Sequence, residues 1–203
     1  MCPISHKHEP VSDIVPLLCV NHVSIPLPSV IAALLNEGNL GNKYDSMKPD
    51  IGISEKNLAH TVAILSTVLS DEMMLYVKTR KFHWNVSGDS FMELHKLFEK
   101  QYVELEESID AVAERINKLG SKTIGTMNEF SKHSNIKETP GKYPGSKEML
   151  KELLKDNETI VQLLRKGVEN CSGSFKDAGT ADFLTGLMEQ HETTAWVLRR
   201  YFL

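Results

Sequence analysis

Hydrophobic residues recur three and four positions apart through most of the chain after residue 53, with polar residues between them. This spacing is typical of amphipathic α-helices, and four separate windows carry it. The sequence therefore predicts an all-α fold of four long helices. The positions expected to face the core are Leu58, Val62, Leu65, Leu69, Met73 and Tyr76 in the first window; Phe91, Leu94, Phe98, Leu105, Ile109, Val112, Ile116 and Leu119 in the second; Leu150, Leu154, Val161, Leu164 and Val168 in the third; and Leu184, Leu187, His191, Ala195, Leu198 and Phe202 in the fourth.

The second helix has the clearest boundaries. Ser90, with Glu93 three residues later, matches a capping box, in which the two residues satisfy each other's free backbone N–H groups. Gly120 suits the end of this helix, because glycine readily takes the left-handed conformation that is common just after a helix. We therefore expect a helix from about Ser90 to Leu119.

The remaining boundaries predict a bundle with one long connection. Ser54 can cap the first helix, and Ser146 begins the third. Glycines and prolines are frequent in residues 121–145, which we interpret as a crossover between the second and third helices. Residues 173–179 separate the third helix from the fourth. One long crossover is a known way of joining a four-helix bundle.

Potential metal ligands lie on one flank of the second helix. With about 100° of rotation per residue, Glu99, Asp110 and Glu114 all fall within about 100° of His95 around the helix axis. His83 continues the inward seam of the first helix, so an imidazole stands where a hydrophobic residue is expected. From spacing alone, an alternative stays open, in which the carboxylates form a solvated helix face and His95 is a satisfied surface histidine.

The ligands on this helix cannot meet within one subunit. The pair His95 and Glu99 lies about 22 Å along the axis from the pair Asp110 and Glu114, at about 1.5 Å per residue. A second copy of the helix, running antiparallel across a two-fold axis, would bring the first pair of one chain to the second pair of the other. Imidazoles and carboxylates without a thiolate suit divalent iron, manganese or zinc better than calcium or magnesium.

These residues resemble the Dps mini-ferritins. The likeness extends over about residues 55–203. It rests on His-Trp-Asn-Val-x-Gly at 83–88, His95 twelve residues after His83, Glu99 four further, Asp-x-x-Ala-Glu-Arg at 110–115, Tyr143-Pro144, and Thr180-Ala181-Asp182. The resemblance implies a ferritin-like four-helix subunit with a long crossover between helices two and three. It also implies a hollow homo-dodecamer with iron sites on its two-fold interfaces.

The resemblance also assigns roles to the candidate ligands. His83, His95 and Glu99 would come from one subunit, and Asp110 and Glu114 from its neighbour. Iron would be the metal, with zinc as a competitor. The implied activity is that of a ferroxidase, which oxidises Fe(II) with hydrogen peroxide, or more slowly with oxygen, mineralises Fe(III) in the shell, and so protects against oxidative stress. The family often has Asp where this chain has Glu99.

Two further features follow from the same resemblance. Asp182 matches the family's aspartate at the three-fold pores through which iron enters, and Asp177 is a weaker pore candidate. The alternative is that Asp182 lies in the first turn of a helix and only offsets its dipole. Trp84 would flank the iron site, either as an oxidisable ring that intercepts radicals or as a packing aromatic.

The chain has 203 residues and a formal net charge of −4, enough for one domain at 54–203 and an N-terminal extension at 1–53. The alternative function is a DNA-binding protein that compacts the nucleoid. Family members that bind DNA do so largely through basic tails, whereas residues 1–53 hold three lysines against five acids. We therefore expect weak DNA binding or none.

The remaining candidates receive plainer interpretations. Residues 15–36 carry no formal charge, but their prolines argue against a membrane helix, and we expect no membrane contact. His191 lies on an apolar face and is predicted to be a core histidine. An ordinary polar terminus is favoured over a metal site at Cys2, His6 and His8. Three unpatterned cysteines, Cys2, Cys19 and Cys171, indicate no disulfide framework and favour the reducing cytoplasm.

Overall fold

The computed structural model describes residues 48–203. The predicted extension at 1–53 lies outside the described residues except for its last part, 48–53. The uncharged segment at 15–36 also lies outside, together with Cys2, His6, His8 and Cys19.

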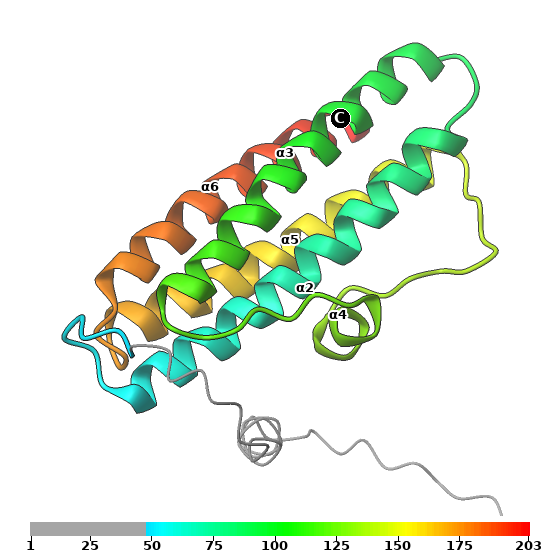
Figure 1. Cartoon of the computed structure of the whole chain (residues 1–203). Coiled ribbons are helices and arrows are strands. Elements are labelled where there is room, and N and C mark those ends of the chain that lie inside the picture. The colour runs from blue at the N-terminus through cyan, green and yellow to red at the C-terminus, as the bar shows by residue number, and fades with distance from the viewer. Residues whose placement is uncertain (1–47) are drawn as a thin grey trace, which may run out of the picture. The chain divides into compact units, whose positions relative to one another are not determined.

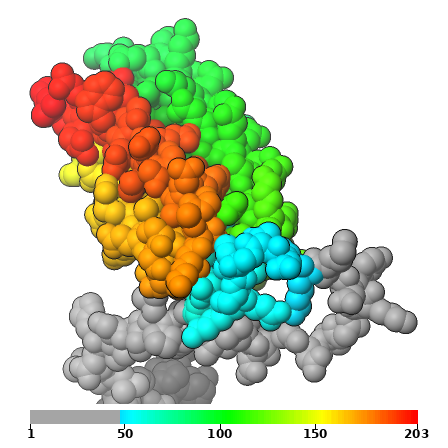
Figure 2. All heavy atoms as spheres, turned by 90° about the vertical axis from the view of Figure 1, so that its left-hand side faces the viewer, coloured from blue at the N-terminus to red at the C-terminus, as the bar shows by residue number. Residues whose placement is uncertain are grey.

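Four long helices form a bundle (Figure 1). Helix α2 pairs with α3, α5 pairs with α6, and α2 also packs against α5. Figure 2 shows α6 between α5 and α3 on one face of the bundle. The described residues contain no strand, and the long connection between α3 and α5 is the predicted crossover, so the all-α prediction is confirmed. The elements are α2 (Glu55–Asn85), α3 (Phe91–Lys118), α4 (Met127–His133), α5 (Ser146–Ser172), α6 (Ala178–Arg199) and the 3₁₀ turn η1 (Arg200–Phe202).

Two predicted helix boundaries are confirmed with their physical reasons. The Ser54 hydroxyl caps α2 by accepting a hydrogen bond from the backbone N–H of Asn57 at 3.3 Å. Gly120 follows α3 with φ +83°, a conformation that favours glycine. A Cβ at Gly120 would also lie 2.5 Å from Cδ of Pro49. Glycine is therefore required here both by backbone conformation and by space.

The capping box predicted at Ser90 is wrong. Ser90 makes no side-chain cap hydrogen bond, and the Glu93 carboxylate instead accepts from the Tyr201 hydroxyl at 2.6 Å. Burial and this hydrogen bond raise the pKa of Tyr201 to about 12. A capping box does occur at Thr126 and Glu129, where it opens α4. This short helix lies within residues 121–145, which were predicted as a crossover without a helix.

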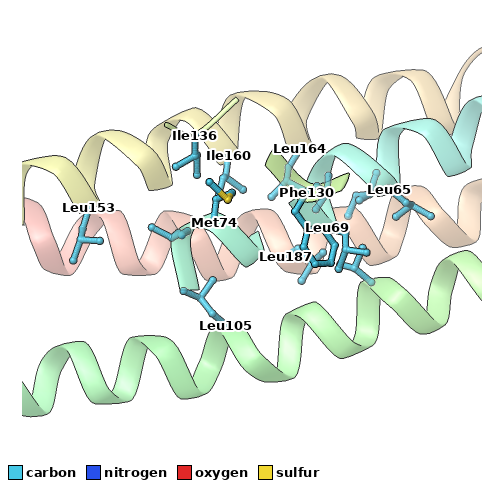
Figure 3. Packing of buried hydrophobic residues seen from close by; sticks show 14 of the residues in the cluster. Leu65, Leu69, Met74, Leu105, Phe130, Ile136, Leu153, Ile160, Leu164 and Leu187 are labelled. Carbon is cyan, nitrogen blue, oxygen red and sulfur yellow. The ribbon is translucent and has the colours of Figure 1, made fainter. Parts of the chain in front are cut away.

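The core lies along the middle of the bundle and under the crossover. Figure 3 shows buried side chains from all four long helices meeting there, with Phe130 of α4 and Ile136 of the crossover among them. Each fully buried Leu or Ile contributes about 1.5–3 kcal/mol relative to an exposed one. The crossover is thus part of the core and is held against α2 by apolar contacts as well as polar ones.

The buried face of α5 is rotated from the predicted one. Leu150 and Leu164 are buried as expected, but Leu154, Val161 and Val168 lie at the edge of the face. The centre of the face includes Asn157. Hydrophobic periodicity does not reveal such a stripe, because the residue at its centre is polar. The actual inward positions are Met149, Leu150, Leu153, Asn157, Ile160, Leu164, Gly167 and Cys171.

Two aromatic residues predicted to be inward are not. Phe91 is 40% exposed at the first position of α3, and Phe202 is 39% exposed in η1. Both stand at the end of a helix, where fewer neighbouring helices remain to cover a side chain.

Only one helix of the described part, α2, is long and apolar enough to span a membrane by length and composition. It is a core helix of the bundle, and 56% of its most apolar window is buried inside the structure.

Hydrogen bonds to Asp71 link the crossover to α2. Its carboxylate is fully buried and accepts hydrogen bonds from the Ser134 hydroxyl at 2.7 Å and from the backbone N–H of Asn135 at 2.6 Å. The Asn135 side-chain amide at 2.9 Å and the Ile136 N–H at 3.3 Å add two more. A buried carboxylate with this many donors is stabilising only while all of them are in place.

Asp71→Ala should lower the free energy of unfolding by about 2–4 kcal/mol, because it leaves buried N–H groups without an acceptor. Urea denaturation at equal subunit concentration measures the change. Glu158→Ala is the matched control, since Glu158 forms an ion pair with Arg199 at the surface and should contribute little. Equal stability of the two variants would show that apolar contacts alone hold the crossover.

Candidate metal centre

His83 and His95 form a closely packed pair where α2 turns into α3. His83 lies in the last turn of α2 and is 8% exposed, and His95 lies in the second turn of α3. The turn that joins the helices reverses the chain at Gly88, which has φ +101°. The two imidazole rings stack with their centroids 3.7 Å apart and 20° between their planes. The sequence analysis placed both histidines at one site, and the fold brings them together.

Reciprocal hydrogen bonds fix both rings. Nδ1 of His83 lies 2.8 Å from the carbonyl oxygen of His95, and Nδ1 of His95 lies 2.9 Å from the carbonyl oxygen of His83. A carbonyl oxygen only accepts, so each Nδ1 carries the hydrogen. In the neutral ring, Nε2 is then the unprotonated nitrogen. This tautomer is the one that presents Nε2 to a metal ion, with orientation supplied by the backbone.

The predicted carboxylate ligands are all on α3 and all exposed. Glu99 lies one turn after His95. Asp110 and Glu114 lie near the other end of the helix, and Glu114 forms an exposed ion pair with Lys118 at 2.9 Å. In the part of the chain that the structure describes, no three His, Cys, Asp or Glu side chains gather closely enough to hold a metal ion. One subunit therefore brings together the histidine pair but not the five ligands.

A shallow, mainly apolar groove lies beside Asp110. It is formed by α2 and α3 and lined by Met73, Tyr76, Glu106, Ile109, Asp110 and Ala113. Farther along the same two helices, Trp84, Met92 and Val103 are exposed hydrophobic residues. The α2–α3 pair thus presents both a groove and projecting apolar side chains.

An aromatic and cationic cluster packs against His83. The Tyr102 ring meets the His83 ring edge to face, with centroids 5.2 Å apart, and Tyr76 meets Tyr102 in the same manner at 6.2 Å. The Arg80 guanidinium lies 4.7 Å from the Tyr102 ring centroid and donates to the Tyr76 hydroxyl at 2.6 Å. That hydrogen bond raises the pKa of Arg80. Trp84, chosen from the sequence, is 66% exposed and lies against Arg80.

Sequence reasoning missed Tyr102. Its position, seven residues after His95 on the same helix, was the available signal, because residues seven apart lie on one face of a helix.

The prediction that His191 lies in the core is confirmed. Its Nδ1 is 2.9 Å from Oδ1 of Asn157, and its Nε2 is 3.4 Å from Oε1 of Glu72. All three side chains are at most 3% exposed. Burial raises the pKa of Glu72, and its second oxygen has no hydrogen-bond partner among the described residues. Glu72 was missed because a carboxylate was not expected inside the apolar stripe.

Glu72→Gln should gain stability relative to the wild type as the pH rises. A raised pKa means that folded Glu72 holds its proton above the ordinary value of 4.5, at which the unfolded chain loses it. The wild type therefore loses stability above about pH 4.5, whereas glutamine has no proton to lose. Thermal unfolding should show a difference in Tm that widens as the pH rises above about 4.5.

Glu107→Gln, at an exposed position of α3, is the control for this comparison. A Tm difference for Glu72→Gln that stays constant over the same pH range would contradict the raised pKa.

The two pore candidates lie in different surroundings. Asp177 is 2% exposed, caps α6 by accepting from the N–H of Thr180 at 2.9 Å, and forms an ion pair with Arg115 at 3.2 Å. It is therefore a structural residue. Asp182 is exposed in the second turn of α6, so the alternative that it acts from the first turn is wrong.

Comparisons with known proteins agree on one family. A family model described as a ferritin-like domain matches residues 62–202. A low-temperature-induced protein of Nostoc sp. is 42% identical over 152 residues, which cover 75% of this chain and 85% of the relative. DNA protection during starvation protein 2 of Bacillus anthracis is 36% identical over 141 residues, which cover 69% of this chain and 94% of the relative.

Solved structures give the same result. A Dps protein from Vibrio cholerae, described as a member of a broad superfamily of ferritin-like diiron-carboxylate proteins, superposes with a TM-score of 0.72 and 26% identity. The superposition covers 77% of this chain and 97% of that one. DpsC from Streptomyces coelicolor gives a TM-score of 0.73 and 26% identity, over 75% and 89% of the two chains.

The four-helix bundle with its long crossover and the matching family model define a ferritin-like protein. Within that class, the chain belongs to the Dps family.

Proposed function

We propose that this protein stores and detoxifies iron as a ferroxidase. Fe(II) is oxidised to Fe(III) by hydrogen peroxide, or more slowly by oxygen, at di-iron sites between subunits, and Fe(III) is mineralised inside a shell of twelve subunits. Membership of the Dps family supports iron storage and protection in general. Fe(II) and peroxide are substrates of this reaction, and protection against oxidative stress follows from their joint consumption.

The observation that carries the proposal is the division of the ligands along one unbroken helix. Helix α3 is continuous from Phe91 to Lys118, so the histidine end and the Asp110–Glu114 end stay about 22 Å apart. An isologous contact between two α2–α3 faces brings opposite ends together twice. The groove beside Asp110 and the exposed Trp84 and Met92 give that face the apolar character of an interface core.

Each site would then combine two kinds of donor. Neutral Nε2 of His83, with the carboxylates of Asp110 and Glu114 from the second subunit, holds the tighter iron. His95 and Glu99 hold the weaker one. The two carboxylates offset the charge of the divalent ion, which favours loss of an electron to give Fe(III). Zinc, which prefers the same donors, competes for the site.

The oxidation is balanced by two iron ions. Hydrogen peroxide accepts one electron from each Fe(II), its O–O bond breaks, and both oxygens leave as hydroxide or water. Because both electrons are supplied within one site, no hydroxyl radical is released. The residues hold the two ions beside one another, so that one peroxide can receive both electrons.

Mixed assembly of two inactive variants tests whether the site is shared. His83→Ala and Asp110→Ala should each abolish most of the rapid Fe(II) oxidation, because each removes a ligand of the tighter iron. A dimer that contains one subunit of each variant has one site without both residues and one intact site. Random co-assembly should therefore restore about a quarter of the wild-type sites. The rate of Fe(III) absorbance increase measures this.

The double variant His83→Ala/Asp110→Ala, co-assembled with the wild type, is the control for the mixing procedure. Its inactive subunits spoil both sites of a mixed dimer, so this mixture should gain nothing beyond its wild-type dimers. Unchanged oxidation in both single variants would overturn the ferroxidase assignment. If each single variant loses rapid Fe(II) oxidation and mixing does not restore it, all the ligands of a site lie in one subunit.

Iron entry through pores lined by Asp182 is part of the proposal. Three exposed carboxylates near a three-fold axis would concentrate Fe(II) in a negative field. Asp182→Asn should slow iron uptake into the shell and reduce its dependence on salt, while shell assembly stays intact. Glu189→Gln, which removes the same charge from an exposed position two turns later on α6, should leave uptake unchanged. Equal uptake in the two variants would mean that iron enters elsewhere.

The cellular setting of the proposal is the reducing cytoplasm. The described cysteine, Cys171, is free and buried, which suits that compartment. The DNA-binding alternative is not adopted, because the chain is acidic overall and lacks the basic excess that counterion release requires.

A further inference from the structure

Tyr102 is the oxidisable side chain in direct contact with the candidate metal centre. Its ring lies edge to face against His83, at 5.2 Å between centroids and 80° between planes. On its other sides it meets the Tyr76 ring and the Arg80 guanidinium. The residue is half-buried, and three neighbours therefore fix the position of its ring. No ligand role needs a phenol at this place.

The two halves of the proposed site differ in how firmly they should hold iron. His83 is buried and held by the fold, whereas Glu99, in the half that binds the weaker iron, is exposed. When Fe(II) is scarce, many sites hold one iron ion. Peroxide that meets a single Fe(II) takes one electron from it and needs a second, and without another donor the second product is a hydroxyl radical.

We propose that Tyr102 supplies the second electron when a site holds a single Fe(II). The inference rests on the proposed function. Hydrogen peroxide takes one electron from the Fe(II) ion that His83 binds and one from the phenol of Tyr102, and its O–O bond breaks. One oxygen leaves as hydroxide, and the other takes the phenolic proton and leaves as water. The products are Fe(III), a neutral phenoxyl radical on Tyr102, one hydroxide and one water, so atoms and charge balance.

The surroundings favour this neutral radical. The Arg80 guanidinium lies 4.7 Å from the centre of the Tyr102 ring, and a fixed positive charge opposes the build-up of positive charge on that ring. The electron therefore leaves together with the proton. The next Fe(II) to bind reduces the radical, with uptake of one proton, and restores the phenol. Two Fe(II) are then consumed for each peroxide even when they bind in succession.

Tyr102 is better placed for this role than Trp84. The ring contact of Trp84 is with Arg80, whereas that of Tyr102 is with a proposed iron ligand. Tyr102 touches a proposed iron ligand directly, and Tyr76 packs behind it as a second phenol whose hydroxyl accepts from Arg80.

The test uses the assembled full-length protein with fewer Fe(II) ions than sites, mixed without oxygen with an equal amount of hydrogen peroxide. Freeze-quenched samples are measured by electron paramagnetic resonance, with ring-deuterated tyrosine to identify a tyrosyl signal, and a spin trap records hydroxyl radicals. The wild type should show a tyrosyl radical and few hydroxyl adducts. Tyr102→Phe keeps the ring packing and should lose the signal while hydroxyl adducts increase.

Tyr143→Phe is the matched control, because Tyr143 lies on the crossover beside Lys81 and is 66% exposed. It should behave as the wild type. The inference is overturned if the wild type forms no tyrosyl radical, if Tyr102→Phe keeps the wild-type signal, or if Trp84→Phe removes it instead. His83→Ala distinguishes failure of the proposed iron site from failure of the role of Tyr102. If His83→Ala oxidises iron as fast as the wild type, the proposed site is wrong. If His83→Ala loses iron oxidation while Tyr102→Phe forms the same radicals as the wild type, only the role of Tyr102 is wrong.

Discussion

The reciprocal hydrogen bonds between His83 and His95 are the constraint on which the candidate site depends. Each imidazole uses Nδ1 to bind the carbonyl oxygen of the other residue, so the end of α2 and the start of α3 are joined at two points. Both rings are thereby oriented by backbone atoms rather than by mobile side chains. A metal ion that binds here meets donors whose rotamers are already fixed, which reduces the entropy lost on binding.

Polar groups inside the bundle serve two different purposes. Both carboxylate oxygens of Asp71 accept hydrogen bonds, and these bonds fix the path of the crossover. Glu72, the next residue, shares one oxygen with His191 and leaves the other without a partner. A satisfied buried carboxylate specifies structure, whereas a partly satisfied one lowers stability and makes it depend on pH. Two adjacent acids on α2 thus have opposite effects on the fold.

Hydrophobic periodicity was enough to predict the four long helices, because most of the buried positions on each helix are apolar. The glycine at position 120 located the end of α3, where backbone conformation and space both require glycine. Periodicity failed wherever a buried position is polar, as at Asn157 and Glu72, since both side chains have their partner, His191, on another helix. The ligand positions followed from spacing and resemblance, but the contact of Tyr102 with His83 depends on how two helices pack. The meeting of the two ligand pairs, which we propose occurs between subunits, cannot be read from a single chain.

The hydrogen bond between Asp71 and Ser134 spans 63 positions, whereas His83 and His95 are twelve apart. Contacts distant in sequence close late, because the chain loses more entropy in forming them. During synthesis, α2 and α3 leave the ribosome first, and they can pair before α5 exists. We therefore expect the histidine half of the site to form in a nascent hairpin, before the crossover and the second hairpin dock and close the core.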